Sequence, residues 1–133
     1  MSRKEPRPAT PEAKALLRAA AGDRKTVELL LQHDDAPVSS VCFHAQQYLE
    51  NVMKAVLVSN AVIFRRTQDL GVLADLLARQ GIELPLPVDQ LRRLNPFAVT
   101  TRYEDMEITI PDIDSVAEMM ENARAWVERQ IQE

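Results

Sequence analysis

The sequence predicts an all-α protein, an up-and-down helical bundle of four main helices plus a short fifth helix. Apolar residues return at steps of three and four along several segments, as they do on one face of a helix. Aromatic residues make up 5% of the chain, which has three glycines. The apolar content therefore rests mainly on Ala, Leu and Val, a mixture that favours helices over sheets.

The chain has the size of one domain. Its 133 residues, 46% of them hydrophobic and 27% charged, are enough for one core. We expect a flexible leader over residues 1–9 and a single helical domain over residues 10–133. No apolar run approaches 18 residues, the N-terminal stretch lacks the apolar core of a secretion signal, and the single Cys42 suits a reducing compartment. We therefore expect a cytoplasmic protein.

The most extended amphipathic pattern covers Pro37–Asn60, and we expect the bundle to be arranged around this helix. One apolar stripe along it consists of Cys42, Ala45, Leu49, Val52 and Val56. These residues share one face because their spacing follows the helical repeat. The stripe, rather than any single polar pair, accounts for the helix.

A polar row lies beside this stripe and consists of Gln46, Gln47, Glu50 and Lys54. Glu50 precedes Lys54 by four residues, the better orientation for a helical ion pair. On a surface such a pair contributes only about 0.3–0.5 kcal/mol. Two interpretations stay open. In the first, the row has a role inside the protein or at a site, either as a buried polar network or as the lining of a groove for a polar ligand. In the second, Gln47 and Lys54 are solvated surface residues.

Local signals predict the ends of the first and third helices. Thr10 suits an N-cap with Pro11 at the first helical position, and this helix runs to about His33. Thr67 is the expected N-cap of the third helix, which Gly81 is placed to end.

The C-terminal third predicts a short helix and a longer one. The short helix covers residues around Leu91–Phe97 and is interrupted near Pro96. Thr100–Ile110 alternates apolar residues but has no second strand to pair with, so we expect an extended loop. Ser115 and Glu118 form an S-x-x-E capping box at the start of the last helix.

Charge is unevenly distributed along the chain. The net charge is −4, with residues 104–133 summing to −7 and residues 1–103 to +3. This asymmetry permits a basic face against an acidic last helix, for oligomer contacts or for an anionic ligand. It falls short of the strongly basic footprint of a dedicated nucleic-acid binder.

Signals of catalytic or metal chemistry are weak. The chain has two histidines, His33 and His44, and neither belongs to an H-E-x-x-H motif. We expect His33 in a solvated turn and His44 at a helix interface. G-x-S-x-G, P-loop and G-x-G-x-x-G motifs are absent from the sequence. We therefore assign no catalytic residue and no metal ligand.

Three arginines are candidates for an anionic ligand. Arg65 and Arg66 precede the expected start of the third helix, where guanidinium groups beside free backbone N–H groups suit a phosphate. An exposed basic loop is the alternative. Arg102 and Tyr103 suit an anion clamp or base stacking, or else Tyr103 closes the core while Arg102 meets an acidic neighbour.

Several segments resemble one known family. The run from Phe43 to Gln47 (FHAQQ), followed by Glu50, Lys54-Ala55 and Leu57, resembles the "FHAQQAxEKxLKAxL" helix of the HEPN family (higher eukaryotes and prokaryotes nucleotide-binding domain). The runs Arg66–Leu70 with Leu76-Leu77, and Leu94-Asn95 through Arg102-Tyr103, are similar to its "R-T-H-D-L…L-L" and "L-N…R-Y-P" segments. The resemblance covers about Ala13 to Val127.

The departures from the family pattern concern function. Gln68 stands where the family commonly has His, and a glutamine cannot act as a general base near neutral pH. RNA-cleaving members carry an Arg four to six residues before a His, which neither His33 nor His44 has. Tyr48 and Asn51 stand where the family usually has Ala and Lys. The resemblance therefore implies a non-cleaving branch.

The resemblance implies a partner and a site. HEPN proteins usually form homodimers, and many act with a minimal nucleotidyltransferase in modules of the toxin–antitoxin type. We therefore expect a non-catalytic homodimeric binding module that needs no cofactor and engages a nucleotidyltransferase partner, a nucleotide such as ATP, or both. The matched motifs assign the site to Gln46, Gln47, Glu50 and Lys54, with Arg65, Arg66, Asp69, Arg102 and Tyr103 as weaker additions.

Two other functions stay open. One is an RNase toxin with an atypical site that uses Arg and Tyr in place of the Arg–His motif, so that RNA is its substrate. The other is a purely structural dimerisation bundle, in which the polar row only fixes the dimer register.

Overall fold

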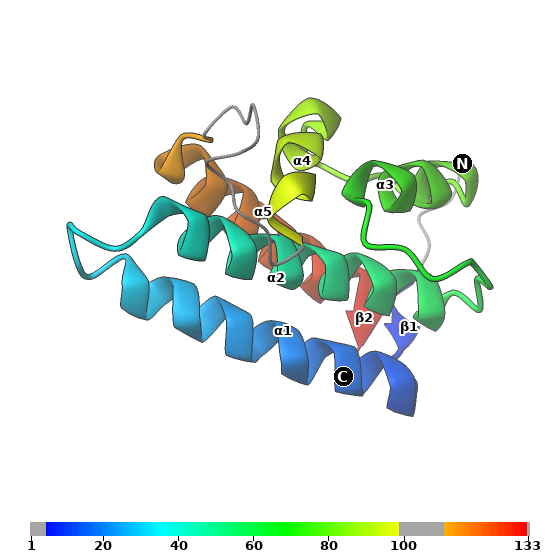
Figure 1. Cartoon of the computed structure of the whole chain (residues 1–133). Coiled ribbons are helices and arrows are strands. Elements are labelled where there is room, and N and C mark those ends of the chain that lie inside the picture. Colours follow the sequence, from blue (N-terminus) through cyan, green and yellow to red (C-terminus); the bar gives the residue numbers. More distant parts are fainter. Residues whose placement is uncertain (1–4, 99–110, 133) are drawn as a thin grey trace.

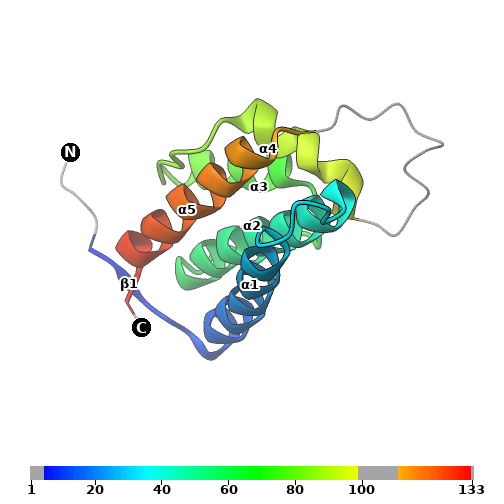
Figure 2. The ribbon, with the colours of Figure 1, turned by 90° about the vertical axis from the view of Figure 1, so that its left-hand side faces the viewer.

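The central element of the fold is α2 (Val38–Ser59), which contacts all of the other helices (Figure 1). The computed structural model describes residues 5–98 and 111–132. α1 (Pro11–Leu30) lies on one side of α2, whereas α3 (Leu70–Arg79) and α4 (Val88–Leu94) lie on the other (Figures 1 and 2). The 3₁₀ turn η1 (Asn95–Ala98) follows α4, and α5 (Ile113–Gln130) packs along α2.

This architecture confirms the predicted all-α bundle of four main helices and a short fifth one. The short fourth helix gives way to η1 at Asn95, next to the predicted interruption at Pro96. Trp126 on α5 is fully buried, and its Nε1 donates a hydrogen bond to the Glu83 carbonyl at 2.7 Å. This bond fixes α5 against the loop that follows α3. None of the helices in the described segments has the length and apolar character needed to cross a membrane.

The start of α1 matches the prediction, whereas the starts of α3 and α5 correct it. Thr10 accepts a hydrogen bond from the backbone N–H of Ala13 at 3.1 Å, as an N-cap does. The expected N-cap Thr67 is wrong, because Asp69 caps α3. The capping box at Ser115 is also wrong, because Asp112 caps α5 and accepts from both the backbone N–H and the hydroxyl of Ser115.

At both of these helix starts the cap is an aspartate, whereas the sequence predicted a threonine or a serine. An Asp carboxylate accepts several hydrogen bonds at once and adds a negative charge where the helix dipole favours it. Asp69 shows this capacity, since its Oδ1 accepts from the N–H groups of Gly71 and Val72 at 2.8 and 3.2 Å. Thr67 instead accepts one bond from the Asp69 N–H at 3.0 Å.

Both α2 and α3 end in a residue with left-handed backbone geometry. Gly81 ends α3 as predicted, with φ +72°, and the next N–H, of Ile82, donates to the Leu77 carbonyl. Ala61 holds the equivalent place after α2 with φ 58°. The N–H of Val62 then donates to the Leu57 carbonyl at 3.0 Å, so both helices end in the same hydrogen-bonded turn.

The two ends of the described chain pair with each other. β1 (Arg7–Pro8) and β2 (Ile131–Gln132) form a two-residue parallel ladder, and the Ala9 N–H donates to the Gln132 carbonyl at 3.0 Å (Figure 2). The end of the leader that we predicted to be flexible over residues 1–9 is therefore attached to the end of α5. Pairs this short carry no periodicity in the sequence. The loop expected over Thr100–Ile110 lies outside the described residues.

Two glycine substitutions are expected to act in opposite directions. Gly22 lies inside α1 and Gly81 at a positive φ, and an added Cβ would meet nothing within 4 Å at either position. Gly22→Ala should raise the free energy of unfolding by about 0.5–1 kcal/mol because Ala favours the helix. Gly81→Ala should lower it by about 1 kcal/mol because of backbone strain. Urea unfolding measures both, and shifts of the same sign would contradict the assigned helix ends.

Candidate functional site

The polar row of α2 points into the bundle. Gln46 is fully buried and Glu50 is 7% exposed, and within the described segments these two make up the buried polar side chains. Gln47 and Lys54 are half-buried at the two ends of the row. Burial of polar side chains is unfavourable unless they are hydrogen-bonded, so their partners decide what the row does.

The four side chains form one continuous hydrogen-bonded chain. Gln47 Nε2 donates to Gln46 Oε1 at 2.7 Å, and Gln46 Nε2 donates to Glu50 Oε1 at 3.1 Å. Lys54 Nζ donates to the other Glu50 oxygen at 2.8 Å. Of the interpretations left open by the sequence, the structure has the buried polar network.

This network reaches beyond α2. Gln46 Nε2 also donates to the backbone carbonyl of Gln68 at 3.0 Å. Gln68 belongs to the connection between α2 and α3 and directly precedes the cap residue Asp69. The network therefore fixes the place at which this connection passes α2. Gln68 makes this contact through its backbone carbonyl. Another residue type at this position could therefore accept the same hydrogen bond.

The ion pair in the network is less exposed than the sequence suggested. The Glu50 and Lys54 side chains are 9% and 15% exposed. The surface value of about 0.3–0.5 kcal/mol therefore does not apply. Removing one partner of such a pair leaves the other charge buried without a counter-charge. The resulting loss in the free energy of unfolding reaches about 3–5 kcal/mol when burial is complete.

Asp69 has a structural role, and it changes the argument for a phosphate site near Arg65 and Arg66. Both arginines are exposed. The backbone N–H groups at the start of α3 already have acceptors, because Asp69 takes two of them and Asn95 Oδ1 accepts from the Leu70 N–H at 2.9 Å. Asn95 Nδ2 donates in turn to Asp69 at 3.0 Å. The helix start therefore adds no free donors to the two guanidinium groups.

The other predicted site residues are not part of this cluster. Arg102 and Tyr103 lie outside the described residues. His44 lies at the interface between α1 and α2, as expected, and its Nδ1 is 2.9 Å from Asp23 Oδ1. His33 is exposed in the turn after α1, also as expected. No group of three or more His, Cys, Asp or Glu within the described parts of the chain could hold a metal ion.

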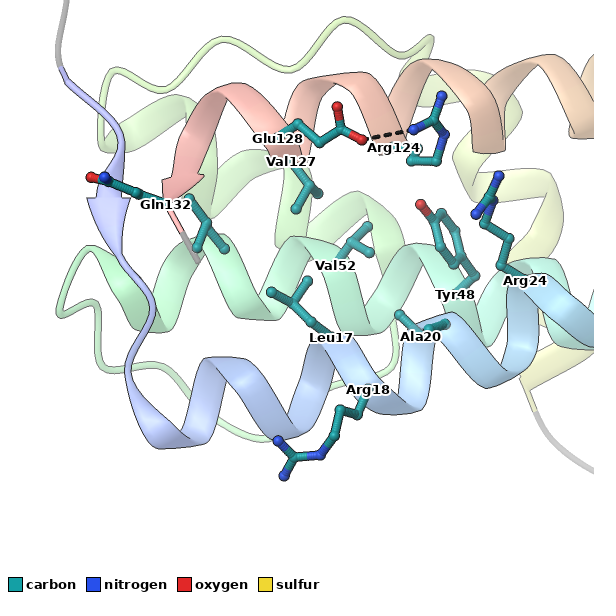
Figure 3. A pocket seen from close by; sticks show the side chains of 12 residues that line it. Leu17, Arg18, Ala20, Arg24, Tyr48, Val52, Arg124, Val127, Glu128 and Gln132 are labelled. Atoms are coloured by element: carbon teal, nitrogen blue, oxygen red, sulfur yellow. Dashed lines mark hydrogen bonds and ion pairs between the residues drawn. The ribbon is translucent and has the colours of Figure 1, made fainter.

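A second polar site was not foreseen from the sequence. A groove with a volume of about 610 Å³ lies between α1, α2 and α5 (Figure 3). Tyr48 of α2 lines it together with Arg24 of α1 and Arg124 of α5. Burial raises the pKa of the Tyr48 phenol to about 12, so the hydroxyl keeps its proton at neutral pH. The one signal in the sequence was Tyr48 at a position where the family usually has Ala.

The sequence of this chain matches one known domain family. The HEPN domain model matches residues 13–130, which is most of the chain. The chain therefore belongs to this family, as the motifs on α2 and α3 predicted.

One curated relative gives the family match a biological context. A protein of Methanocaldococcus jannaschii named "Putative toxin MJ1304" is 35% identical to this chain over 71 residues. These residues make up 53% of this chain and 45% of the relative, so the match spans less than half of the relative's length. No solved structure matches the chain.

Adjacent glutamines provide a test of the network. Gln46→Leu is close in size but removes the bonds to Glu50 and to the Gln68 carbonyl as well as the acceptor of Gln47, so we expect it to lower the free energy of unfolding by about 2–3 kcal/mol. Gln47→Leu removes one bond at the half-exposed end and should cost less than about 1 kcal/mol. Urea denaturation measures the difference. Equal costs would mean that Gln46 is not the centre of the network.

Proposed function

We propose that this protein is a non-catalytic HEPN module of the toxin–antitoxin type, which forms a homodimer and acts with a minimal nucleotidyltransferase partner. A nucleotide such as ATP is the proposed ligand of the assembly. The family match supports the general class, and the name of the relative supports the toxin–antitoxin setting.

The observation that carries the non-catalytic assignment is the state of the two histidines. Neither His33 nor His44 follows an Arg by four to six residues. The Nδ1 atom of His44 is also engaged by Asp23 at 2.9 Å, and both side chains are partly buried between two helices of the same chain. An aspartate on Nδ1 is also how a catalytic histidine is oriented, so this contact does not argue against catalysis. The missing arginine four to six residues before either histidine is what supports binding rather than cleavage.

The exposed connection between α2 and α3 is the proposed partner surface. Ile63 is 98% exposed, and Arg65 and Arg66 follow it, also exposed. An apolar side chain fully in water beside two cations suits a partner with an apolar pocket rimmed by carboxylates. Gln47 and Lys54 are half-buried at the two ends of the network, and the bond from Gln46 to Gln68 holds the connection in position.

The purely structural bundle stays the second candidate because one observation favours it. The buried polar atoms of Gln46 and Glu50 are all engaged within the chain, so the network does not require an outside ligand. In that case the polar row contributes only to stability and dimer register. The two candidates differ in whether variants of Arg65 and Arg66 lose a partner while the protein keeps its fold.

The test combines oligomeric state, RNA integrity and partner binding. Light scattering should give a mass of about twice 15.0 kDa, and RNA incubated with the purified protein should stay intact. A nucleotidyltransferase from the same genome should co-elute with the protein but not with an Arg65→Ala, Arg66→Ala variant. The matched control is Arg79→Ala, which removes another exposed arginine, on α3, and should leave co-elution unchanged.

Three outcomes would contradict the proposal. RNA cleavage that disappears in Arg102→Ala would establish the atypical RNase. A monomeric mass would remove the homodimer. Co-elution that is unchanged in the double variant would remove the partner surface.

A further inference from the structure

We propose that the groove between α1, α2 and α5 binds an organic phosphate, a molecule that carries a phosphate group on an apolar or planar body. The groove lies on the side of α2 opposite to the polar network, since Tyr48 follows Gln46 by two residues and a helix turns by about 200° over that step. None of the residues assigned from the sequence lines this groove.

The first observation is the hydroxyl group of Tyr48. The residue is 4% exposed, and its hydroxyl makes no hydrogen bond to any residue that the structure describes. Figure 3 shows the hydroxyl directed to the space between the side chains of Arg24 and Arg124. Although the residue as a whole is buried, its hydroxyl is open to water in the groove, because the buried side-chain polar atom without a partner among the described residues is Ser59 Oγ. A donor at the wall of a groove is available to a ligand that displaces this water.

The second observation is the state of the two arginines. Arg124 donates to Glu121 and Glu128 on its own helix, and these bonds fix the direction of its guanidinium group without using all of its N–H donors. Arg24 has only a loose pair with Glu28 at 3.8 Å, with both side chains about half exposed. Two guanidinium groups that converge on a tyrosine hydroxyl suit the several oxygens of a phosphate better than a single acceptor.

The third observation is the rest of the lining. Arg18 also borders the groove, but Figure 3 shows its guanidinium group directed away from Tyr48, and Glu128 is the acid of the lining. Leu17, Val52 and Val127 provide an apolar wall. The volume of about 610 Å³ lies in the range of small-molecule sites and far exceeds that of a phosphate group. The ligand therefore carries a body that covers the apolar wall.

The nucleotide named above is one member of this ligand class, and to that extent the inference rests on the proposed function. A phosphate on an aliphatic chain has the same chemistry. The two sources differ in whether the body is planar or flexible, and the choice of probes separates them.

Calorimetry with four probes tests the inference: AMP, adenosine, inorganic phosphate, and a short-chain phosphatidic acid below its micelle concentration. We expect AMP or the phosphatidic acid to bind at least about tenfold more tightly than adenosine and phosphate do, because only these two probes engage both the donors and the apolar wall. AMP as the tighter probe would indicate a nucleotide, and the phosphatidic acid an aliphatic phosphate.

Three variants locate the site. Tyr48→Phe removes only the hydroxyl, and Arg24→Gln alters a half-exposed side chain, so each should weaken binding about tenfold without unfolding the protein. Arg129→Gln changes an exposed arginine of α5 that does not line the groove, and should leave binding unchanged.

Three results would overturn the inference: no binding of any probe at millimolar concentration, equal binding of phosphate and its esters, or equal effects of Tyr48→Phe and Arg129→Gln. The dimer mass and the integrity of RNA do not depend on this groove. Failure here is therefore distinguishable from failure of the proposed function.

Discussion

The burial of the Glu50 carboxylate on the central helix is the constraint on which the rest of the structure depends. A carboxylate taken out of water needs a cation and hydrogen-bond donors, and Lys54 and Gln46 supply them at 2.8 and 3.1 Å. Gln46 then reaches the Gln68 carbonyl, directly before Asp69 caps α3. One connected set of contacts therefore runs from the middle of α2 to the start of α3.

The two faces of α2 differ in how completely their polar groups are used. The face toward the start of α3 carries the network, whose buried atoms are all engaged. The face toward α1 and α5 carries Tyr48, whose hydroxyl has no partner among the described residues. A satisfied network stabilises and positions, whereas the open donor between Arg24 and Arg124 is the group that the proposed ligand would contact. This contrast separates the structural role of α2 from its proposed ligand site.

Local periodicity was enough to predict the helices and the polar row, because both are properties of one segment. It could not choose among neighbouring cap residues. Asp69 caps α3, and its carboxylate accepts a hydrogen bond at 3.0 Å from Asn95, which lies 26 residues further along the chain. The groove was missed for the same reason, since its donors come from three helices. Only the packing of α1 and α5 on α2 brings together Arg24, Tyr48 and Arg124.

A double-mutant cycle on Glu50 and Lys54 tests the central claim most directly, with Glu50→Gln, Lys54→Met and the double variant compared by urea unfolding. The exposed pair Asp75 and Arg79 on α3 has the same spacing and order, and serves as the control. We predict a favourable coupling of about 1–3 kcal/mol for the buried pair, little changed by salt, against about 0.3–0.5 kcal/mol for the control. Equal couplings that both vanish in high salt would contradict the account.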